Sequence, residues 1–539
     1  MASFYIENFG CRATQADGAA LERQFLDRGL ERAGTARDAE IVVLNTCTVT
    51  EGADKDARAS IRRLQRVNPD CRILVTGCYA QRAPEELAAL PGVTWVVGNS
   101  HKHQAAEIAT SSSAGFVSLA QLSGAQEPSP PFRKERERVG HPDERVAHPG
   151  NVVVGDIFAH TELLAAPVFE AANERTRPNL KVQDGCDNRC SFCVIPYVRG
   201  KSRSLAMERV VAEVRTLVEA DYREVVISGI NLGRWGRDLE VVGRRSLVVG
   251  KQNPRQDRLI AAAFEGELAE SYSEQLATND QRFAGLIRAI LDQTSLQKLR
   301  ISSVEPMDWS DELIGLMAAS PRIAKHAHVP LQSGSDAVLR RMHRKYRPWH
   351  YREKIGKIRA AMPTAAIGAD VMVGFPGETE TEFAETRAMI DELPLTYLHV
   401  FTYSARPGTP AAHQAGQVPV AVARERNRAL RELASQKKAA FMGSLVGTAV
   451  EAITLQSGGA EFTEALTENY LKIRIPGHYE ANRWMILNIE GTYGEMFVGR
   501  PVSHREGWSG SGMSGVPDVG VTRECTEAIN ELTYNPLEA

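Results

Sequence analysis

Short, strongly apolar segments alternate with amphipathic segments along most of this chain, and this alternation limits the folds available to it. Residues 41–44 form a continuous run of Ile, Val and Leu, which is typical of a strand buried on both faces. Between such runs, Leu21, Phe25 and Leu30 recur at helical spacing. Buried strands separated by helices indicate a parallel, doubly wound sheet. We therefore predict an amino-terminal doubly wound α/β domain over residues 1–110.

The same alternation returns further along the chain. Residues 111–174 are predicted to be a linker, because much of this range is rich in Ser, Pro, Gly and charge. Residues 175–440 contain about six strand–helix units, enough for a closed or partial parallel barrel, with residues 236–281 as an insertion without an interpretable motif. Residues 443–503 form a short β-rich module, and the Gly/Ser-rich residues 504–539 are predicted to be a disordered tail.

The composition is that of a globular protein. Its 539 residues exceed what one hydrophobic core holds, and a formal net charge of -3 gives no overall basic surface for nucleic acid. A membrane-spanning helix needs about 18 or more consecutive apolar residues, and no stretch of the sequence approaches that length. The first residues lack the basic and apolar regions of a signal peptide. We therefore expect a cytoplasmic protein, in a reducing compartment where clustered cysteines are more often metal ligands or catalytic groups than disulfides.

The cysteines are concentrated in one part of the chain, with seven of the eight in the first 193 residues. Cys11, Cys47 and Cys78 each follow a predicted strand. Because the carboxyl ends of parallel strands share one edge of a sheet, these three are expected to converge there. Cys71 lies at the opposite end of its strand and is expected to take no part.

Cys186, Cys190 and Cys193 are spaced C-x₃-C-x₂-C, a pattern with two interpretations. A zinc site would need a fourth ligand from elsewhere, and zinc sites favour two C-x₂-C pairs. A 4Fe-4S cluster normally has four cysteine ligands, so three would leave one iron open to a substrate or cofactor.

The C-x₃-C-x₂-C spacing, with Phe192 directly before the last cysteine and the predicted strand LKVQDG before the first, resembles the signature of radical S-adenosylmethionine enzymes. Further segments are similar to the methylthiotransferase family within that group, namely GCDNRCSFCVIPYVRGKSRS, HVPLQSGSDAVLRRMHRKY, VMVGFPGETETEF and FTYSARPGTPA. The resemblance covers roughly residues 1–105 and 175–503. It implies a partial (β/α)₆ radical-SAM barrel in the centre and a carboxy-terminal small β-barrel like the RNA-binding TRAM domain.

The resemblance also implies two 4Fe-4S clusters. The C-x₃-C-x₂-C cysteines would hold one whose open iron binds S-adenosylmethionine. The three strand-end cysteines would hold a second, auxiliary cluster, with ordinary buried thiols as the alternative. The chain departs from the family pattern at Thr14, where Asn is usual. This difference concerns a contact beside the auxiliary cluster, not a ligand.

Six further residues are candidates for binding the cofactor, most of them at the ends of barrel strands, where active sites of such barrels form. They are Phe192, Gly229, Asn231, Glu305, Gln332 and Ser333. Plainer explanations stay open for some of them. Gly229 and Asn231 could form a strand-to-loop turn, and Glu305 could pair with an arginine.

Three substrates occur in the family: threonylcarbamoyladenosine in tRNA, isopentenyladenosine in tRNA, and an aspartate of a ribosomal protein. NFGCRATQADG and NTCTVTEGAD are most similar to the threonylcarbamoyladenosine branch, since the isopentenyl branch usually has Arg in place of Thr50. The implied reaction adds a methylthio group to C2 of N6-threonylcarbamoyladenosine at tRNA position 37. It uses two S-adenosylmethionine molecules per turnover, an electron donor such as flavodoxin or ferredoxin, and a sulfur donor.

A function of a different class is a non-catalytic iron–sulfur protein that binds RNA or transfers electrons. Such a carrier should complete each cluster with four protein ligands, whereas this chain offers three per group. For RNA contact, residues 340–347 (RRMHRKYR) offer five Lys or Arg and a tyrosine. A solvated helix end is the alternative explanation for this segment.

Overall fold

The computed structural model describes residues 2–111, 152–160, 163, 177–239, 282–459 and 461–502. Most of the predicted linker, the predicted insertion from residue 240 onward and the predicted tail lie outside the described residues, as does Cys525.

Parallel strands form the amino-terminal sheet, as the apolar runs predict. The strand order is β2-β1-β3-β4-β5-β6, and every neighbouring pair is parallel. The strands are β1 (Ser3–Asn8), β2 (Glu31–Arg32), β3 (Ile41–Thr46), β4 (Arg72–Gly77), β5 (Val93–Gly98) and β6 (Val152–Val153). The helices are α1 (Arg12–Asp27), α2 (Glu51–Val67), α3 (Cys78–Arg82), α4 (Pro84–Ala88), the 3₁₀ helix η1 (Asn99–Gln104) and α5 (Ala105–Thr110).

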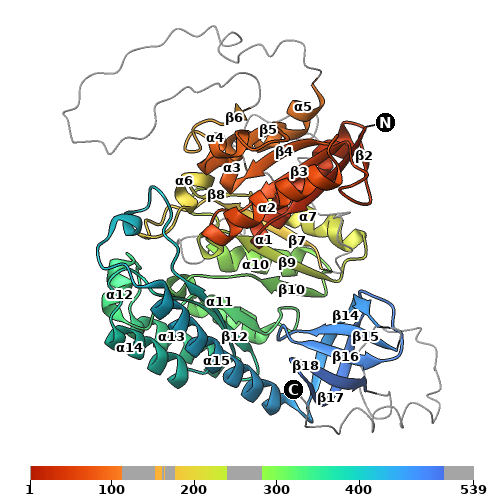
Figure 1. Ribbon diagram of the computed structural model, residues 1–539. Coiled ribbons are helices and arrows are strands. Elements are labelled where there is room, and N and C mark those ends of the chain that lie inside the picture. Colours follow the sequence, from red (N-terminus) through yellow and green to blue (C-terminus); the bar gives the residue numbers. More distant parts are fainter. Residues whose placement is uncertain are drawn as a thin grey trace, which may run out of the picture. The chain divides into compact units, whose positions relative to one another are not determined.

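Helices cover both faces of this sheet (Figure 1). Val43 and Leu74 pack with apolar residues of α1 and α5, whereas Val42 and Val75 pack with those of α2. Neighbouring strand residues point to opposite faces, so one apolar run supplies both cores. The predicted doubly wound domain is confirmed.

Two strands of this sheet were not predicted. Both β2 and β6 have only two residues, too few to produce an apolar run. Strand β6 pairs with β5, so residues 152–153 belong to the sheet although they fall inside the range predicted to be a linker.

Six further parallel strands form the central part of the chain, in two sheets ordered β8-β7-β9-β10 and β11-β12-β13. The strands are β7 (Asn179–Asp184), β9 (Glu224–Gly229), β10 (Lys298–Ile301), β11 (His326–His328), β12 (Ala366–Val373) and β13 (Tyr397–Thr402), with β8 (Arg203–Ser204) antiparallel to β7. The helices are α6 (Ile195–Arg199), α7 (Met207–Glu219), α10 (Arg282–Gln293), α11 (Asp311–Ala319), α12 (Asp336–Arg341), α13 (Pro348–Ala361), α14 (Glu380–Glu392) and α15 (Val420–Leu445), with short 3₁₀ helices η3 (Leu232–Arg234), η4 (Pro306–Asp308) and η5 (Pro410–His413).

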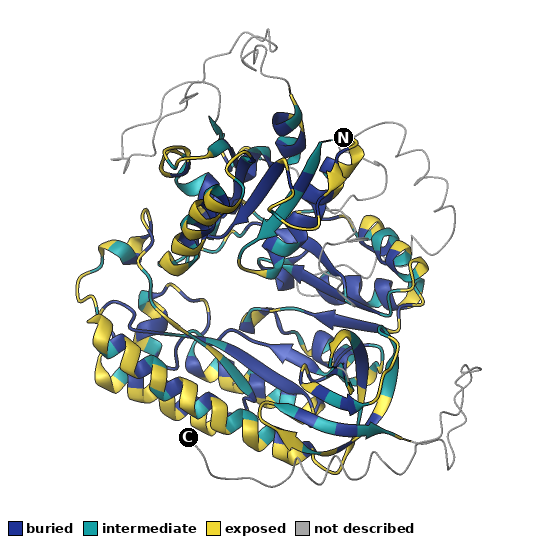
Figure 2. Ribbon diagram, turned by 45° about the vertical axis from the view of Figure 1, so that its right-hand side comes forward, coloured by how far each residue is buried: buried dark blue, intermediate teal, exposed yellow. Residues whose placement is uncertain are grey.

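The largest apolar core lies between these strands and their helices. Ala327, Ala369 and Val371 pack into it from β11 and β12. Figure 2 shows the strands as mostly buried and the outward faces of the helices as exposed. The alternate strand residues point to the opposite face, the inside of the partial barrel, and many of them are polar. This arrangement confirms the expected partial (β/α)₆ barrel.

A closed barrel of five strands forms the carboxy-terminal part, in the order β14-β15-β16-β18-β17. The strands are β14 (Ala449–Gly458), β15 (Phe462–Thr467), β16 (Lys472–Pro476), β17 (Trp484–Tyr493) and β18 (Met496–Pro501). Met442 and Leu445 at the end of α15 pack into its small core. The expected small β-barrel is confirmed. No helix within the described ranges is both long and apolar enough to cross a membrane.

Asp54 of α2 forms a buried ionic contact between the amino-terminal domain and the central barrel. Its carboxylate accepts hydrogen bonds from Arg82 at 3.0 Å and from Arg406, which lies beyond β13. The hydroxyl of Thr48 donates to it as well, at 2.6 Å. The side chains of Asp54 and Arg406 are only 3% and 4% exposed, so neither charge is solvated if the other is lost.

We predict that Asp54→Asn destabilises the protein by about 3 to 5 kcal/mol, because it leaves the buried guanidinium of Arg406 without its carboxylate. The measurement is the urea midpoint followed by intrinsic fluorescence. Asp27→Asn, which removes the exposed pair with Arg23, is the control and should cost less than about 1 kcal/mol. Equal urea midpoints for the two variants would show that the buried contact of Asp54 does not stabilise the protein more than an exposed ion pair.

Candidate active site

The cysteines of the C-x₃-C-x₂-C motif lie in a loop that leaves the carboxyl end of β7. Gly185 begins this loop with φ of +70°, and a Cβ at this position would lie 1.9 Å from the carbonyl oxygen of Lys201. A residue with a side chain therefore cannot replace it without moving the backbone. The loop is anchored at Ser191, whose hydroxyl donates to the carbonyl of Arg341 at 2.7 Å.

Nitrogen donors point at the sulfurs of this motif. Cys186 Sγ accepts from the backbone nitrogen of Asn188 at 3.4 Å and from Asn231 Nδ2 at 3.6 Å. Cys190 Sγ accepts from Arg344 Nη1 at 3.2 Å. Such donors stabilise thiolates, which are the form that binds iron.

Without a metal, the thiols of Cys186 and Cys193 would hold their protons. Burial, and after it the neighbouring Cys190 and Cys186, raises the pKa of Cys193 to about 12. Burial also raises the pKa of Cys186. Three thiolates whose charges act on one another need positive charge between them, which an iron–sulfur cluster with its iron ions would provide. The donor set therefore fits a cluster.

The predicted cofactor-binding residues have different surroundings. Asn231 lies beside the motif, since its side chain donates to Cys186 and its backbone nitrogen donates to Gln183 Oε1 at 2.7 Å. Gly229 ends β9, where a Cβ would lie 2.9 Å from the same Gln183 oxygen. Glu305 pairs with Arg344, as the alternative explanation for this residue expected. Arg344 also contacts Cys190, so this pair lies beside the cysteine motif.

The remaining three candidates are held by packing or by backbone contacts. Phe192 meets Phe375 edge-on, with ring centroids 6.4 Å apart. Ser333 is fully buried, and its hydroxyl bonds that of Thr386 in α14 at 3.0 Å. The backbone of Gln332, at φ of +62°, bridges to β12. The hydrogen bond to Thr386 gives Ser333 a structural role that does not require the cofactor.

The strand-end cysteines converge at one edge of the amino-terminal sheet. Cys11 follows β1, Cys47 follows β3, and Cys78 is the first residue of α3 after β4. A Cβ on Gly10, whose φ is +95°, would lie 2.9 Å from Cys47 Sγ, so glycine allows two of the loops to approach each other. Cys71 precedes β4 at the opposite end of that strand.

These three thiols also influence one another. Burial raises the pKa of Cys47 to about 12, and Cys78 and Cys11 contribute to the increase. Asn99 Nδ2 donates to Cys78 Sγ at 3.6 Å. The hydroxyl of Thr14, where the family usually has Asn, lies 3.5 Å from Cys11 Sγ. A polar contact beside this cysteine is therefore kept.

A buried ionic network connects the two groups of cysteines. Asp17 of α1 accepts from Lys102 at 2.9 Å, from Arg199 at 3.0 Å and from Lys181. Asp184 at the end of β7 accepts from Arg199 at 3.0 Å and from Lys181 at 2.7 Å. Burial alone would raise the pKa of Asp17, but the three cations hold it well below its usual value. Sequence analysis did not find this network.

The predicted RNA-contact segment is largely engaged in other contacts. Arg344 is buried, and Arg341 pairs with Glu382 at 2.7 Å. Arg340 and Arg347 both pair with Asp336, at 2.8 and 3.3 Å. The five cations of residues 340–347 therefore do not form one exposed basic surface, and Arg344 belongs to the cysteine site instead.

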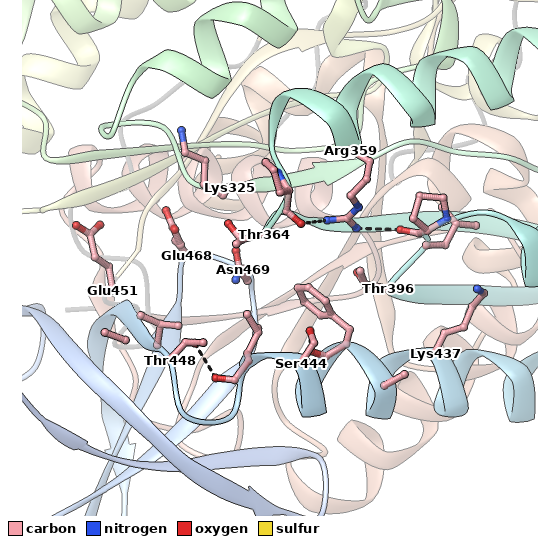
Figure 3. A pocket seen from close by; sticks show the side chains of 18 of the residues that line it. Lys325, Arg359, Thr364, Thr396, Lys437, Ser444, Thr448, Glu451, Glu468 and Asn469 are labelled. Atoms are coloured by element: carbon pink, nitrogen blue, oxygen red, sulfur yellow. Dashed lines mark hydrogen bonds between the residues drawn. The ribbon is translucent and has the colours of Figure 1, made fainter.

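A pocket of about 670 Å³ lies elsewhere, between the ends of α13 and α15 and the start of β14 (Figure 3). Its cations donate to main-chain carbonyls. Lys325 bonds Ser320, Arg359 bonds Pro363 and Pro394, and Lys437 bonds Leu393. None of the predicted site residues lines it, and these cations stabilise chain ends and turns.

Comparisons with known proteins match both parts of the chain that contain these cysteines. The family described as "Uncharacterized protein family UPF0004" matches residues 3–98, and the Radical SAM superfamily matches residues 180–251 and 257–390. "Threonylcarbamoyladenosine tRNA methylthiotransferase MtaB" of Bacillus subtilis is 33% identical over 88% of this chain and 91% of its own length. The protein of the same name from Aquifex aeolicus is 32% identical over 88% of this chain and 97% of its own length.

A relative with another name is nearly as similar. "tRNA-2-methylthio-N(6)-dimethylallyladenosine synthase" of Saccharopolyspora erythraea is 31% identical over 86% of this chain and 80% of its own length. Both names describe methylthio transfer, and both matched families lie on the parts of the chain that carry the two groups of cysteines. The chain therefore belongs to the radical S-adenosylmethionine methylthiotransferase family.

Proposed function

We propose that this enzyme adds a methylthio group to C2 of N6-threonylcarbamoyladenosine at position 37 of tRNA. The observation that carries the proposal is the pair of incomplete cysteine sites, three thiols each, connected through one buried network. A protein that only carries electrons would need a fourth ligand at each site. The names of the relatives support the reaction and its tRNA substrate.

Each cysteine group would hold one 4Fe-4S cluster. The cluster at Cys186, Cys190 and Cys193, when bound, supplies the electron that cleaves S-adenosylmethionine to a radical able to break the C2–H bond. Arg344 would keep a positive charge beside Cys190, and Asn231 would donate to Cys186. The group at Cys11, Cys47 and Cys78 would hold the auxiliary cluster.

The inside of the barrel favours a polar substrate group. His326 and His328 of β11, Asp370 of β12, and Tyr397 and His399 of β13 occupy the strand positions opposite the helix-facing core. An isopentenyl group would need an apolar surface there, whereas a threonylcarbamoyl group brings a carboxylate and a hydroxyl. Nδ1 of His326 is buried without a hydrogen-bond partner in the described part of the chain, and a buried polar group that the wrong substrate leaves unpaired discriminates against that substrate.

Thr50 has a structural explanation that is independent of the substrate. Its hydroxyl caps α2 by accepting from the backbone nitrogen of Ala53 at 3.2 Å. A residue that can cap the helix, of which Thr is one, is therefore expected at this position whatever the substrate. The substrate proposal is supported by the barrel lining and the relatives instead.

The reaction also requires partners. An electron donor such as flavodoxin or ferredoxin would reduce the cluster, and a sulfur donor would renew the sulfur that is transferred. We place the enzyme in the cytoplasm, with its tRNA substrate.

We predict that the two cysteine groups separate functionally. The reconstituted protein should hold about eight iron ions, and Cys190→Ala and Cys47→Ala should each keep about four. Cys190→Ala should produce no 5′-deoxyadenosine, whereas Cys47→Ala should still cleave S-adenosylmethionine but form no methylthio product.

Iron analysis measures the cluster content, and chromatography measures the 5′-deoxyadenosine that each variant produces. Cys71→Ala is the control and should keep all of the iron, since Cys71 lies at the other end of its strand. Loss of half the iron in Cys71→Ala would show that the wrong cysteines were assigned.

We predict a clear preference between tRNAs. The enzyme should methylthiolate tRNA that carries threonylcarbamoyladenosine and leave isopentenyladenosine tRNA almost unchanged, because the barrel lining is polar. Mass spectrometry of nucleosides after incubation with each tRNA separately tests this. Equal or faster turnover of the isopentenyl tRNA would exclude the proposed substrate but not the radical chemistry.

A further inference from the structure

Arg12 lies where the three folded parts of the chain meet. It follows Cys11, and its carbonyl oxygen accepts from Asn179 Nδ2 of β7 at 2.7 Å. Its guanidinium donates to the hydroxyl of Tyr470, in the turn between β15 and β16, at 2.9 Å. Arg12 is half-buried and Tyr470 is 38% exposed, so a ligand can reach both side chains.

Positive charge is in excess around Tyr470. The guanidiniums of Arg12, Arg177 and Arg300 lie 5.5, 5.7 and 5.3 Å from the centre of its ring. Glu224 pairs with Arg300 at 2.6 Å and with Arg177 at 3.5 Å. Within the described part of the chain, Arg12 makes no ion pair with a carboxylate, and its recorded side-chain partner is the phenol of Tyr470.

The electrostatics of Tyr470 reflect this excess. Burial would raise its pKa, but Arg12, Arg177 and Arg300 bring the pKa below its usual value. The local field thus favours a negative group beside this ring. Arg300 and Arg177 both pair with Glu224, and Arg300 also donates to two main-chain carbonyls. Of the three guanidiniums, Arg12 is therefore the one without a carboxylate partner in the described part of the chain, and it has donors left for a ligand.

A series of polar side chains, two of them buried histidines, leads from Tyr470 toward the radical-SAM cysteines. The ring of His326 lies 5.2 Å from that of Tyr470, and His326 Nε2 bonds the hydroxyl of Tyr397 at 2.7 Å. Further along, His328 bonds Ser303 at 2.7 Å. Glu305 lies two residues after Ser303 and pairs with Arg344, which contacts Cys190.

We propose that Arg12, backed by Tyr470, binds the carboxylate of the threonylcarbamoyl group and so determines the choice of substrate. The planar guanidinium matches a carboxylate with two parallel hydrogen bonds, and charge-assisted bonds are the stronger kind. The inference rests on the proposed function, because an isopentenyl group has no carboxylate. A backbone phosphate of the tRNA has the same anionic chemistry, so the experiment must separate the two anions.

The test compares Arg12→Gln, Arg12→Lys and the unaltered enzyme on two tRNAs that differ only at position 37, one with threonylcarbamoyladenosine and one with plain adenosine. Arg12→Gln should raise the KM for the modified tRNA by about 10- to 100-fold. Its affinity for the plain tRNA should stay within about twofold. Arg12→Lys keeps the positive charge but cannot form two parallel hydrogen bonds to a carboxylate. Its KM for the modified tRNA should therefore lie between those of Arg12→Gln and the unaltered enzyme.

Arg23→Gln, on an exposed face of the same helix, is the matched control and should behave like the unaltered enzyme. Iron content and cleavage of S-adenosylmethionine without tRNA, both unchanged in Arg12→Gln, show that the neighbouring Cys11 site is intact. Methyl esterification of the threonyl carboxylate should abolish the advantage of the unaltered enzyme over Arg12→Gln.

Two outcomes would overturn the inference. An equal loss of affinity for both tRNAs would assign Arg12 to a backbone phosphate, and an unchanged KM would leave it a structural partner of Tyr470. Failure of the unaltered enzyme to modify the threonylcarbamoyl tRNA would instead reject the proposed function, so the two failures are distinguishable.

Discussion

The buried pairing of Asp17 and Asp184 with Lys102, Lys181 and Arg199 fixes how the two cysteine sites face each other. All five side chains are nearly inaccessible, and charges removed from water to this extent are stable only when every partner is present. Asp17 comes from the helix that Cys11 begins, and Asp184 lies two residues before Cys186. Ion pairs are directional, so they fix the relative position of the two cysteine loops. Apolar packing is not directional and would not fix that position by itself.

The same arrangement brings one guanidinium to each group of thiols. Arg199 lies near the auxiliary site and is tied to two carboxylates, and Arg344 contacts Cys190 and is tied to Glu305. Arginine stays protonated in any protein environment, so neither positive charge depends on pH. Because each is paired with a carboxylate, it is also held in one place. Both cysteine sites thus combine a fixed cation with amide donors, a combination suited to thiolates bound to iron.

Sequence reasoning succeeded where the signal is local. Apolar runs identified the longer strands of the amino-terminal sheet and of the central barrel, and cysteines placed directly after strands converged as expected because strand ends share an edge. It failed where the signal is distant or absent. The contact between Asp17 and Lys181 joins residues 164 positions apart and leaves no pattern in the sequence. Arg344 was taken for part of an exposed basic segment, because burial by Glu305 and the cysteine loop cannot be recognised from neighbouring residues.

Under the proposed role of Arg12, the carboxy-terminal barrel forms part of the substrate site. Its β15–β16 turn places Tyr470 at φ of +66°, a conformation that costs a residue with a side chain about 1 kcal/mol. The turn is held by its own hydrogen bonds to Thr467 and by Arg300, which donates to the carbonyls of Thr467 and Glu468. Backbone strain kept in place by a fully buried arginine of the central barrel indicates that the position of the Tyr470 ring matters. Substrate choice in this enzyme would then depend on all three folded parts, with Arg12 from the first, the histidine-lined strands from the second and Tyr470 from the third.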